Sequence, residues 1–204
     1  MAPRDSAATQ ERILAAATTE FAAKGIAGAR VDDIAAAAGV NKRMLYYYFG
    51  SKEELFREIL RRKLAERVAS AAELGDLQRV DRAVVRQRDH LADRDYIRLL
   101  MWEALEDAQR EGVVGEDDRR EVYQGWVDSI RSAQTAGDIP KEYDPAQFVL
   151  TEMALTIFPA AFPQLARLVS GREVDDPEFL VGREQFLREF YGRLGPSTAQ
   201  HGHE

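Results

Sequence analysis

Apolar side chains recur along this chain at the three- and four-residue spacing of an α-helix, and the alternation typical of a strand is nearly absent. Ile13, Ala17 and Phe21 form one such stripe, which predicts a helix over about residues 9–24 with Thr9 as its N-cap. The same reasoning predicts an all-α chain of about nine helices. The others are expected over about residues 32–38, 42–49, 52–74, 77–93, 95–111, 117–136, 145–170 and 177–194.

Glycines and prolines indicate where these helices end or bend. Gly25 is placed to end the first helix, and Gly39 supplies the backbone freedom that a tight turn between two helices needs. Pro159 and Pro163 must kink or divide the helix predicted over 145–170, because a proline inside a helix removes a hydrogen bond and clashes with the preceding turn.

The segment Val31–Lys52, VDDIAAAAGVNKRMLYYYFGSK, has the pattern of a helix-turn-helix. Ala35 provides a small residue where two short helices would cross, and a glycine follows in the turn. Two cations and three tyrosines crowd the second helix, which is a poor composition for a core but a good one for meeting phosphates and base edges. The apolar anchors expected to face inward are Ile34, Ala38, Val40, Leu45 and Phe49.

The order of residues along the second short helix predicts their roles in DNA binding. A recognition helix contacts base edges through its N-terminal residues, which makes Lys42, Arg43 and Tyr46 the candidates for base contact. One tyrosine of the run is expected to lie partly in the core instead. The later residues expected to contact the phosphate backbone are Tyr47, Tyr48 and Lys52.

Charge is distributed unevenly along the chain. The net charge is −7, but residues 1–52 hold seven Lys or Arg and five acids, so this segment is +2 and residues 53–204 are −9. A weakly basic head on an acidic body is expected if the head alone contacts phosphate. We therefore predict a DNA-binding head over 1–52, a connecting helix over about 52–74, and a body over 75–204 that begins at Gly75.

Composition narrows the class of protein further. The 204 residues are 45% hydrophobic and 31% charged and include no cysteine, which excludes disulfides, thiolate metal ligands and cysteine nucleophiles. No apolar run is long enough to span a bilayer, and the N-terminal MAPRDSAATQ lacks the apolar segment of a secretory signal. We expect a cytoplasmic protein with no membrane partner.

The stretches ERILAAATTEFAAKGI and VDDIAAAAGVNKRMLYYYFGSKEELF, at this spacing, resemble the N-terminal domain of the TetR (tetracycline-repressor-like) family of bacterial transcriptional regulators. The resemblance covers about Thr9 to Leu60. It implies base contacts from Lys42, Arg43 and Tyr46, as well as phosphate contacts from Tyr47, Tyr48 and Lys52. Two positions depart from the family pattern. Arg30 replaces the usual capping Thr or Ser, so it would reach phosphate as a charge and the helix cap must come from elsewhere, and Met44 replaces a small or hydroxyl residue.

The resemblance also implies a homodimer that pairs through its last two long helices, with a cavity for a small-molecule effector in each C-terminal domain. Leucines at seven-residue spacing in the last helix independently favour a buried stripe, and Gly182 would allow close helix approach. The stripe fits a core within one subunit as well as an interface, because periodicity cannot distinguish the two. The expected interface residues are Phe148, Leu180, Leu187, Phe190 and Leu194.

Aromatic and apolar residues in the middle helices predict the neighbourhood of the effector, whose identity the sequence leaves open. Each of them also fits ordinary core packing. In the implied mechanism, an effector tilts the helix over about 52–74 and changes the spacing of two heads set roughly 34–36 Å apart on a palindromic operator. The predicted neighbourhood comprises Tyr96, Leu99, Trp102, Tyr123, Trp126, Met153 and Phe158.

Three other classes of protein are alternatives to a DNA-binding regulator. An enzyme is not expected, because His90 is the one histidine outside the tail and no metal spacing, phosphate loop, dinucleotide motif or nucleophile motif occurs. For the same reason we expect no cofactor and no metal. A helical small-molecule-binding protein without DNA binding, and a nucleoid-type DNA binder without an effector, remain as alternatives.

Overall fold

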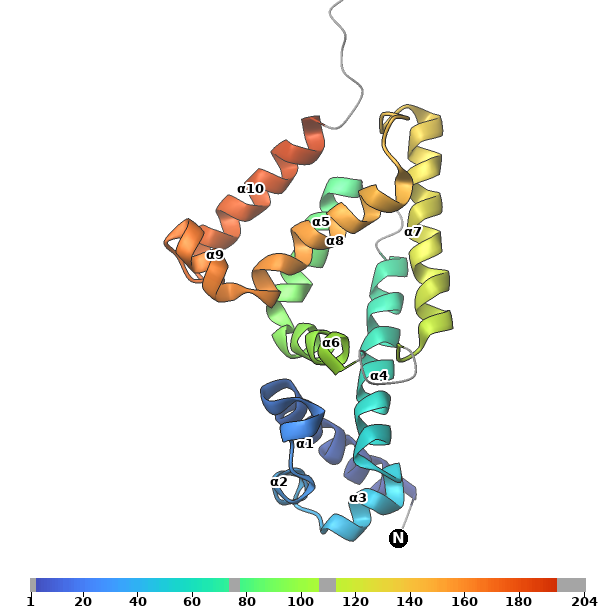
Figure 1. Cartoon of the computed structure of the whole chain (residues 1–204), viewed down its shortest axis with the longest axis vertical. Helices are drawn as coiled ribbons and strands as arrows, with labels where there is room; N and C mark the ends of the chain where they lie inside the picture. The colour runs from blue at the N-terminus through green and yellow to red at the C-terminus, as the bar shows by residue number, and fades with distance from the viewer. Residues whose placement is uncertain (1–2, 74–77, 107–112, 194–204) are drawn as a thin grey trace, which may run out of the picture. The chain divides into compact units, whose positions relative to one another are not determined.

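The computed structural model describes residues 3–73, 78–106 and 113–193, and the regular structure within these ranges is α-helical, as predicted. The helix predicted over 145–170 divides into two, because α8 ends at Ala161 and α9 begins at Pro163 after a bend of 90°. The helices are α1 Pro3–Gly28, α2 Val31–Ala38, α3 Lys42–Phe49, α4 Lys52–Glu73, α5 Arg79–Ala92, α6 Arg94–Glu106, α7 Glu116–Ala136, α8 Pro145–Ala161, α9 Pro163–Ser170 and α10 Pro177–Arg193 (Figure 1).

The first helix differs from its prediction at its start. It begins at Pro3, so Thr9 is a buried residue inside α1 and the prediction that it caps the helix was wrong. Gly25 interrupts the helix as predicted, because its φ of 68° and ψ of 177° are not helical, and one further short turn within α1 follows it to Gly28. A glycine can take this backbone conformation because it has no Cβ.

The short helices are capped by residues close to them in sequence, and Gly39 lies in the turn where it was expected. Gly39 follows α2 in the left-handed conformation, with φ 65° and ψ 37°. The backbone N–H of Met44 donates to Asn41 Oδ1 at 2.8 Å at the start of α3. The N–H of Glu54 donates to Ser51 Oγ at 3.0 Å at the start of α4. These bonds satisfy N–H groups that have no partner inside the helix.

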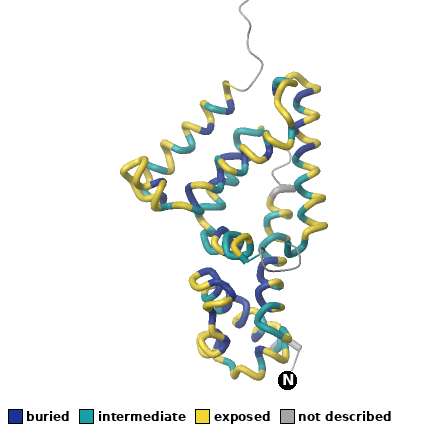
Figure 2. Tube along the Cα trace, viewed as in Figure 1, coloured by how far each residue is buried: buried dark blue, intermediate teal, exposed yellow. Residues whose placement is uncertain are grey.

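The helices pack into two units. The first unit holds the described residues of Met1–Ala72 and Asp93–Glu116, namely α1 to α4 with α6. Phe21 and Phe56 meet edge to face at its centre, with ring centroids 5.5 Å apart. Figure 2 shows buried residues concentrated where α1, α2 and α4 face one another.

The second unit holds the described residues of Glu73–Ala92 and Asp117–Glu204, in which α5 packs against both α8 and α10. Arg183 on α10 donates to the carbonyl of Leu155 at 2.6 Å and to Gln87 Oε1 at 3.2 Å, and so joins α10 to α8 and α5. Two clusters of buried apolar residues lie among the described residues of this unit. One comprises Ala83, Val84, Leu187 and Tyr191, and the other comprises Val127, Ile130, Ile139 and Val149.

The two units are defined by how the helices pack, and α6 belongs to the first of them. The functional division into a head over 1–52 and a body from residue 75 is a separate matter and stays a prediction. Gly75 itself lies outside the described residues. Within the described ranges, no single helix has both the length and the apolar character needed to cross a membrane; α8 and α9 pass that test only as a sharply bent pair.

Candidate nucleic-acid interface

The turn between α2 and α3 is held by buried anchors and backbone bonds. Ile34 and Leu45 are fully buried, and the N–H of Val40 donates to the carbonyl of Ala35 at 3.0 Å. Arg12 Nε on α1 donates to the carbonyl of Ala38 at 3.1 Å, which satisfies a carbonyl at the end of α2. The two short helices are therefore fixed to each other and to α1, with the outer face of α3 left open to solvent.

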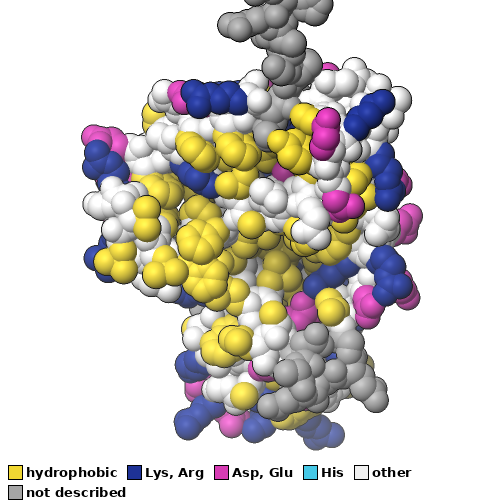
Figure 3. All heavy atoms as spheres, turned by 45° about the horizontal axis from the view of Figure 1, so that its top comes forward, with side chains coloured by type: hydrophobic (Ala, Val, Ile, Leu, Met, Phe, Trp, Pro, Cys, Tyr) yellow, Lys and Arg dark blue, Asp and Glu magenta, His cyan; other side chains and the backbone are white. Residues whose placement is uncertain are grey.

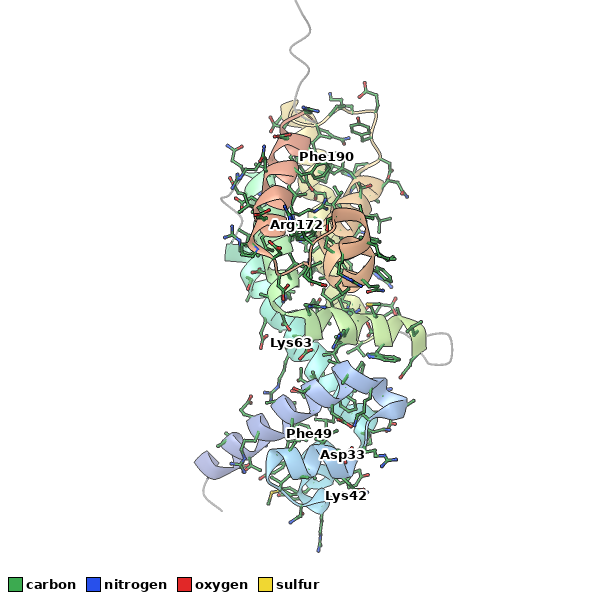
Figure 4. The ribbon with its side chains drawn as sticks, turned by 90° about the vertical axis from the view of Figure 1, so that its left-hand side faces the viewer. Asp33, Lys42, Phe49, Lys63, Arg172 and Phe190 are labelled. Carbon is green, nitrogen blue, oxygen red and sulfur yellow. The ribbon has the colours of Figure 1, made fainter. Side chains whose placement is uncertain are left out.

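That outer face presents cations and phenols. Tyr46 is 41% exposed and Tyr47 is 81% exposed. Arg43 is exposed and makes no hydrogen bond or ion pair with any described residue. Lys42 Nζ lies 3.1 Å from Asp32 Oδ2, and this hydrogen bond raises the pKa of the Lys42 ammonium (Lys42 is labelled in Figure 4). Both partners are largely exposed, so the ion pair is weak and can exchange for another acceptor.

The start of α2 shows how the chain manages without a capping Thr or Ser. Arg30 occupies the cap position and its side chain makes no capping bond. Instead, the backbone N–H of Arg30 donates to Glu20 Oε1 on α1 at 3.2 Å. Asp32 and Asp33 lie in the first turn of α2, where negative charge interacts favourably with the helix dipole. The Arg30 side chain remains exposed.

Tyr48 is the tyrosine of the run that lies partly in the core. Its ring meets those of Tyr47 and Phe49 at centroid distances of 5.2 and 6.4 Å. Its hydroxyl is buried and has no hydrogen-bond partner. The prediction that Tyr48 contacts phosphate does not fit this structure, because a buried hydroxyl is not presented to DNA.

Lys52, at the first position of α4, points back toward the start of α2. Its Nζ donates to the carbonyl of Ala29 at 3.3 Å, in a partly buried position. The ammonium therefore lies beside the backbone that leads into Arg30. Phosphate contact by either residue stays a prediction.

The predicted effector residues on α6 pack within the first unit. Leu99 and Tyr96 are buried, and the Arg67 guanidinium lies 5.0 Å from the Tyr96 ring centroid. Trp102 Nε1 donates to the carbonyl of Ala22 at 3.2 Å, and its indole covers Gly25, where an added Cβ would lie 2.7 Å from Trp102 Cε3. Sequence reasoning missed this packing of α6 on α1.

The other predicted effector residues lie in the second unit. Tyr123 and Trp126 are neighbours on α7 with ring centroids 5.3 Å apart, and Met153 packs against a buried cluster beside Trp126. Phe158 is exposed and faces Phe162 at 5.3 Å. None of the seven predicted residues lines either of two cavities found in this unit, of about 370 and 320 Å³. Their contact with an effector stays a prediction.

The predicted interface residues have different surroundings. Leu187 is 1% exposed and packs with Ala83 and Val84, so its assignment to a dimer interface was wrong, because its surface is already buried within one chain. Phe148 and Phe190 line the larger cavity, and Leu180 is partly exposed beside the smaller one. Leu194 lies outside the described residues.

A different set of apolar side chains is exposed on the second unit. Sequence reasoning missed most of them, although Leu150, Ala154 and Phe158 fall at four-residue spacing on one face of α8. Figure 3 shows hydrophobic side chains gathered over α8, α9 and α10. We call this set the apolar face; it comprises Leu150, Phe158, Phe162, Leu165, Leu168, Val169, Leu180, Val181 and Phe186.

Comparisons with known proteins agree with this arrangement. Residues 13–59 match the family model described as bacterial regulatory proteins of the tetR family, and residues 80–190 match the tetracyclin repressor-like C-terminal domain. The chain is 36% identical over 172 residues to the HTH-type transcriptional repressor SCO4008 of Streptomyces coelicolor, covering 84% of this chain and 88% of that repressor.

Two further relatives extend over most of the chain. The HTH-type transcriptional regulator RutR of Escherichia coli K12 is 30% identical over 190 residues, covering 86% of this chain and 85% of RutR. The crystal structure of the transcriptional regulator SCO4942 of Streptomyces coelicolor superposes with a TM-score of 0.74 at 30% identity, covering 92% of this chain and 98% of that one. The helix-turn-helix, the helical second unit and these matches together show that the chain is a DNA-binding transcriptional regulator, not an enzyme, and that it belongs to the TetR family.

Proposed function

We propose that this regulator is a homodimeric repressor that binds a palindromic operator in the cytoplasm and is released from it by a small-molecule effector. The observation that carries this proposal is the outer face of α3, which exposes cations and phenols to solvent while the inner face of the helix packs on a buried core. Relatives named as repressors favour repression over activation.

Within this proposal, Lys42, Arg43 and Tyr46 contact base edges in the major groove. They lie within the first five residues of α3, and this is the part of a recognition helix that reaches the bases. Arg43 is available without breaking any bond, whereas Lys42 must exchange Asp32 for a base. Arg30, Tyr47 and Lys52 contact phosphate and set the register on the duplex without reading sequence.

The apolar face is the proposed dimer interface. Exposed apolar patches of this kind in otherwise polar surfaces mark sites of protein association. Gly182 on α10 supports the proposal, because a Cβ added there would meet no atom of the same chain within 4 Å. A second copy could therefore bring a helix close to α10 at that position.

The effector acts in this proposal by binding two states of the dimer unequally, since a ligand with equal affinity for both would shift nothing. α4 is the natural element to transmit the difference, because it starts beside the helix-turn-helix at Lys52 and continues to Glu73. A change in its tilt would alter the spacing of the two recognition helices.

Replacing Lys42 or Tyr46 with Ala should reduce discrimination between operator and random DNA by about 5- to 150-fold, corresponding to about 1–3 kcal/mol per lost base contact. The operator is obtained first by selection from a random DNA pool, and affinities for operator and random duplexes are then measured by fluorescence anisotropy. Lys52→Ala is the matched control, since loss of a phosphate contact should weaken both duplexes alike and reduce the salt slope by about one.

If Lys42→Ala and Tyr46→Ala weakened the binding of operator and random DNA equally, neither residue would be a base contact. Failure of the wild-type protein to enrich any sequence would contradict the proposed operator binding itself.

Replacing Phe158 with Glu should weaken dimerisation by roughly tenfold or more, because a carboxylate on the apolar face would be buried without a partner in the dimer. Sedimentation velocity over a concentration series measures the change. Leu105→Glu on α6 introduces the same charge at an exposed leucine of the first unit and should leave the dimer intact. If Phe158→Glu left dimerisation unchanged, this part of the apolar face would be excluded from the dimer interface.

A further inference from the structure

The larger cavity of the second unit has aromatic walls. It lies between the start of α8 and the end of α10, and its volume of about 370 Å³ is within the range of small-molecule sites. Its rings belong to Tyr143, Phe148, Phe190 and Tyr191; the first two have centroids 6.1 Å apart, and the last two meet edge to face at 5.7 Å (Phe190 is labelled in Figure 4). Such walls bind flat or apolar bodies and attract cations to their ring faces.

The charged side chains that line this cavity, among the described residues, are both acidic. Asp144 is exposed at the N-cap of α8 and accepts the N–H of Gln147 at 2.9 Å. Glu152 is 8% exposed, and its Oε1 is buried with no hydrogen-bond partner. Tyr191, at 7% exposed, has a buried hydroxyl beside the Glu152 carboxyl; it acts on the pKa of that carboxyl as a hydrogen-bond donor, but without the geometry of a well-formed bond. Two buried polar groups that have only this poorly formed contact are costly for the fold unless something else bonds them.

Three arginines on α5 act on Glu152 from a distance. Burial raises the pKa of the Glu152 carboxyl, while the charges of Arg86, Arg79 and Arg82 oppose that rise. Arg86 instead lies over the Trp126 ring at 4.8 Å and Arg79 over the Phe148 ring at 5.5 Å, and neither lines the cavity. A cation held at hydrogen-bond distance from Glu152 would be closer to the carboxylate than these guanidinium groups, so it could make the direct charge-assisted bond that they do not make.

We propose that this cavity binds a small organic cation, an ammonium group on an apolar or aromatic body, with Glu152 as its counter-ion and the Tyr191 hydroxyl as a second hydrogen-bond partner. The aromatic walls hold the body, and the charge-assisted bond to Glu152 selects the ammonium. An anion would meet two carboxyl groups, and a neutral ligand would make no charge-assisted bond to Glu152. The binding of this cation in the cavity is independent of the proposed function. Its role as the effector rests on the proposed function.

Calorimetric titration of the full chain with three probes of similar size tests the charge preference: 2-phenylethylammonium, 2-phenylethanol and phenylacetate. The ammonium should bind at least about tenfold more tightly than the alcohol, and the carboxylate most weakly. Glu152→Gln keeps the size of the side chain and should remove most of this preference. Tyr191→Phe should lower the affinity for the ammonium several-fold. Glu189→Gln, an exposed carboxylate on α10, is the matched control and should change nothing.

Equal affinity for the ammonium and the alcohol, no binding of the ammonium, or full retention of the preference in Glu152→Gln would each overturn the proposal. The comparison of probes on the wild-type protein needs no variant, so it stands even if Glu152→Gln fails to fold. The titrations contain no DNA, so their failure leaves the proposed repressor intact, and loss of operator binding leaves the cation site intact. Addition of 2-phenylethylammonium to the operator complex then tests whether the two are linked.

Discussion

Replacing Gly25 with Ala is expected to destabilise the first unit by about 2–5 kcal/mol, from backbone strain together with a steric clash. The conformation of Gly25, with φ 68° and ψ 177°, is one that residues with a Cβ essentially never adopt. The added Cβ would also lie 2.7 Å from the Trp102 indole, which is itself held by its bond to the Ala22 carbonyl. Hydrogen exchange of the amides in α1 to α3 measures the loss in this unit separately from the rest of the chain.

Gly39→Ala is the control for backbone strain alone. Gly39 also has a positive φ, but an added Cβ there meets nothing within 4 Å, so the cost should be about 1–2 kcal/mol. Adding Trp102→Ala to each variant completes a double-mutant cycle, in which Gly25→Ala should become less costly and Gly39→Ala should not change. Equal effects of the two glycine substitutions would mean that the Trp102 contact contributes nothing.

Replacing Leu45 with Ala should destabilise the first unit by about 2–5 kcal/mol, the usual range for a fully buried leucine that leaves a cavity. Leu45 anchors α3 from its inner face, so operator binding should weaken too, through loss of the ordered recognition helix rather than loss of a contact. Denaturant unfolding followed by circular dichroism, with hydrogen exchange to assign the loss to the first unit, measures the change.

Tyr47→Ala separates stability from contact on the same helix. Tyr47 is two residues further along and 81% exposed, so its removal should change stability by less than about 0.5 kcal/mol. DNA affinity should still fall if Tyr47 contacts phosphate. A Leu45→Ala variant as stable as Tyr47→Ala would contradict the buried anchor.

The parts of the fold that were predictable from sequence depend on nearby residues. Gly39, Asn41 and Ser51 each cap a helix within one turn of their own position, and Gly39 has the role predicted for it. Thr9 failed as a cap because helix formation continues past it to Pro3. Leu187 failed because its seven-residue spacing is compatible with a core as well as an interface, and packing against α5 decided between them.

The long-range contacts could not be predicted in this way. Trp102 meets the carbonyl of Ala22, eighty residues earlier, and no local pattern marks that pairing. The proposed cation site likewise joins Glu152 to Tyr191 from separate helices. Sequence reasoning placed the effector among aromatic residues but could not tell which of them face a cavity, because burial depends on the packing of the whole unit.

The ion pair between Lys42 and Asp32 has a consequence for how sites on DNA compete. Under the proposed role of Lys42, each base offered to its ammonium must bind it better than Asp32 does. At an unsuitable base the lysine stays with its own carboxylate, the charges of the pair cancel, and the complex gains no contact at this position. Selectivity at this position would then come from an internal competitor that lowers the lifetime of wrong complexes, rather than from greater attraction to the right one.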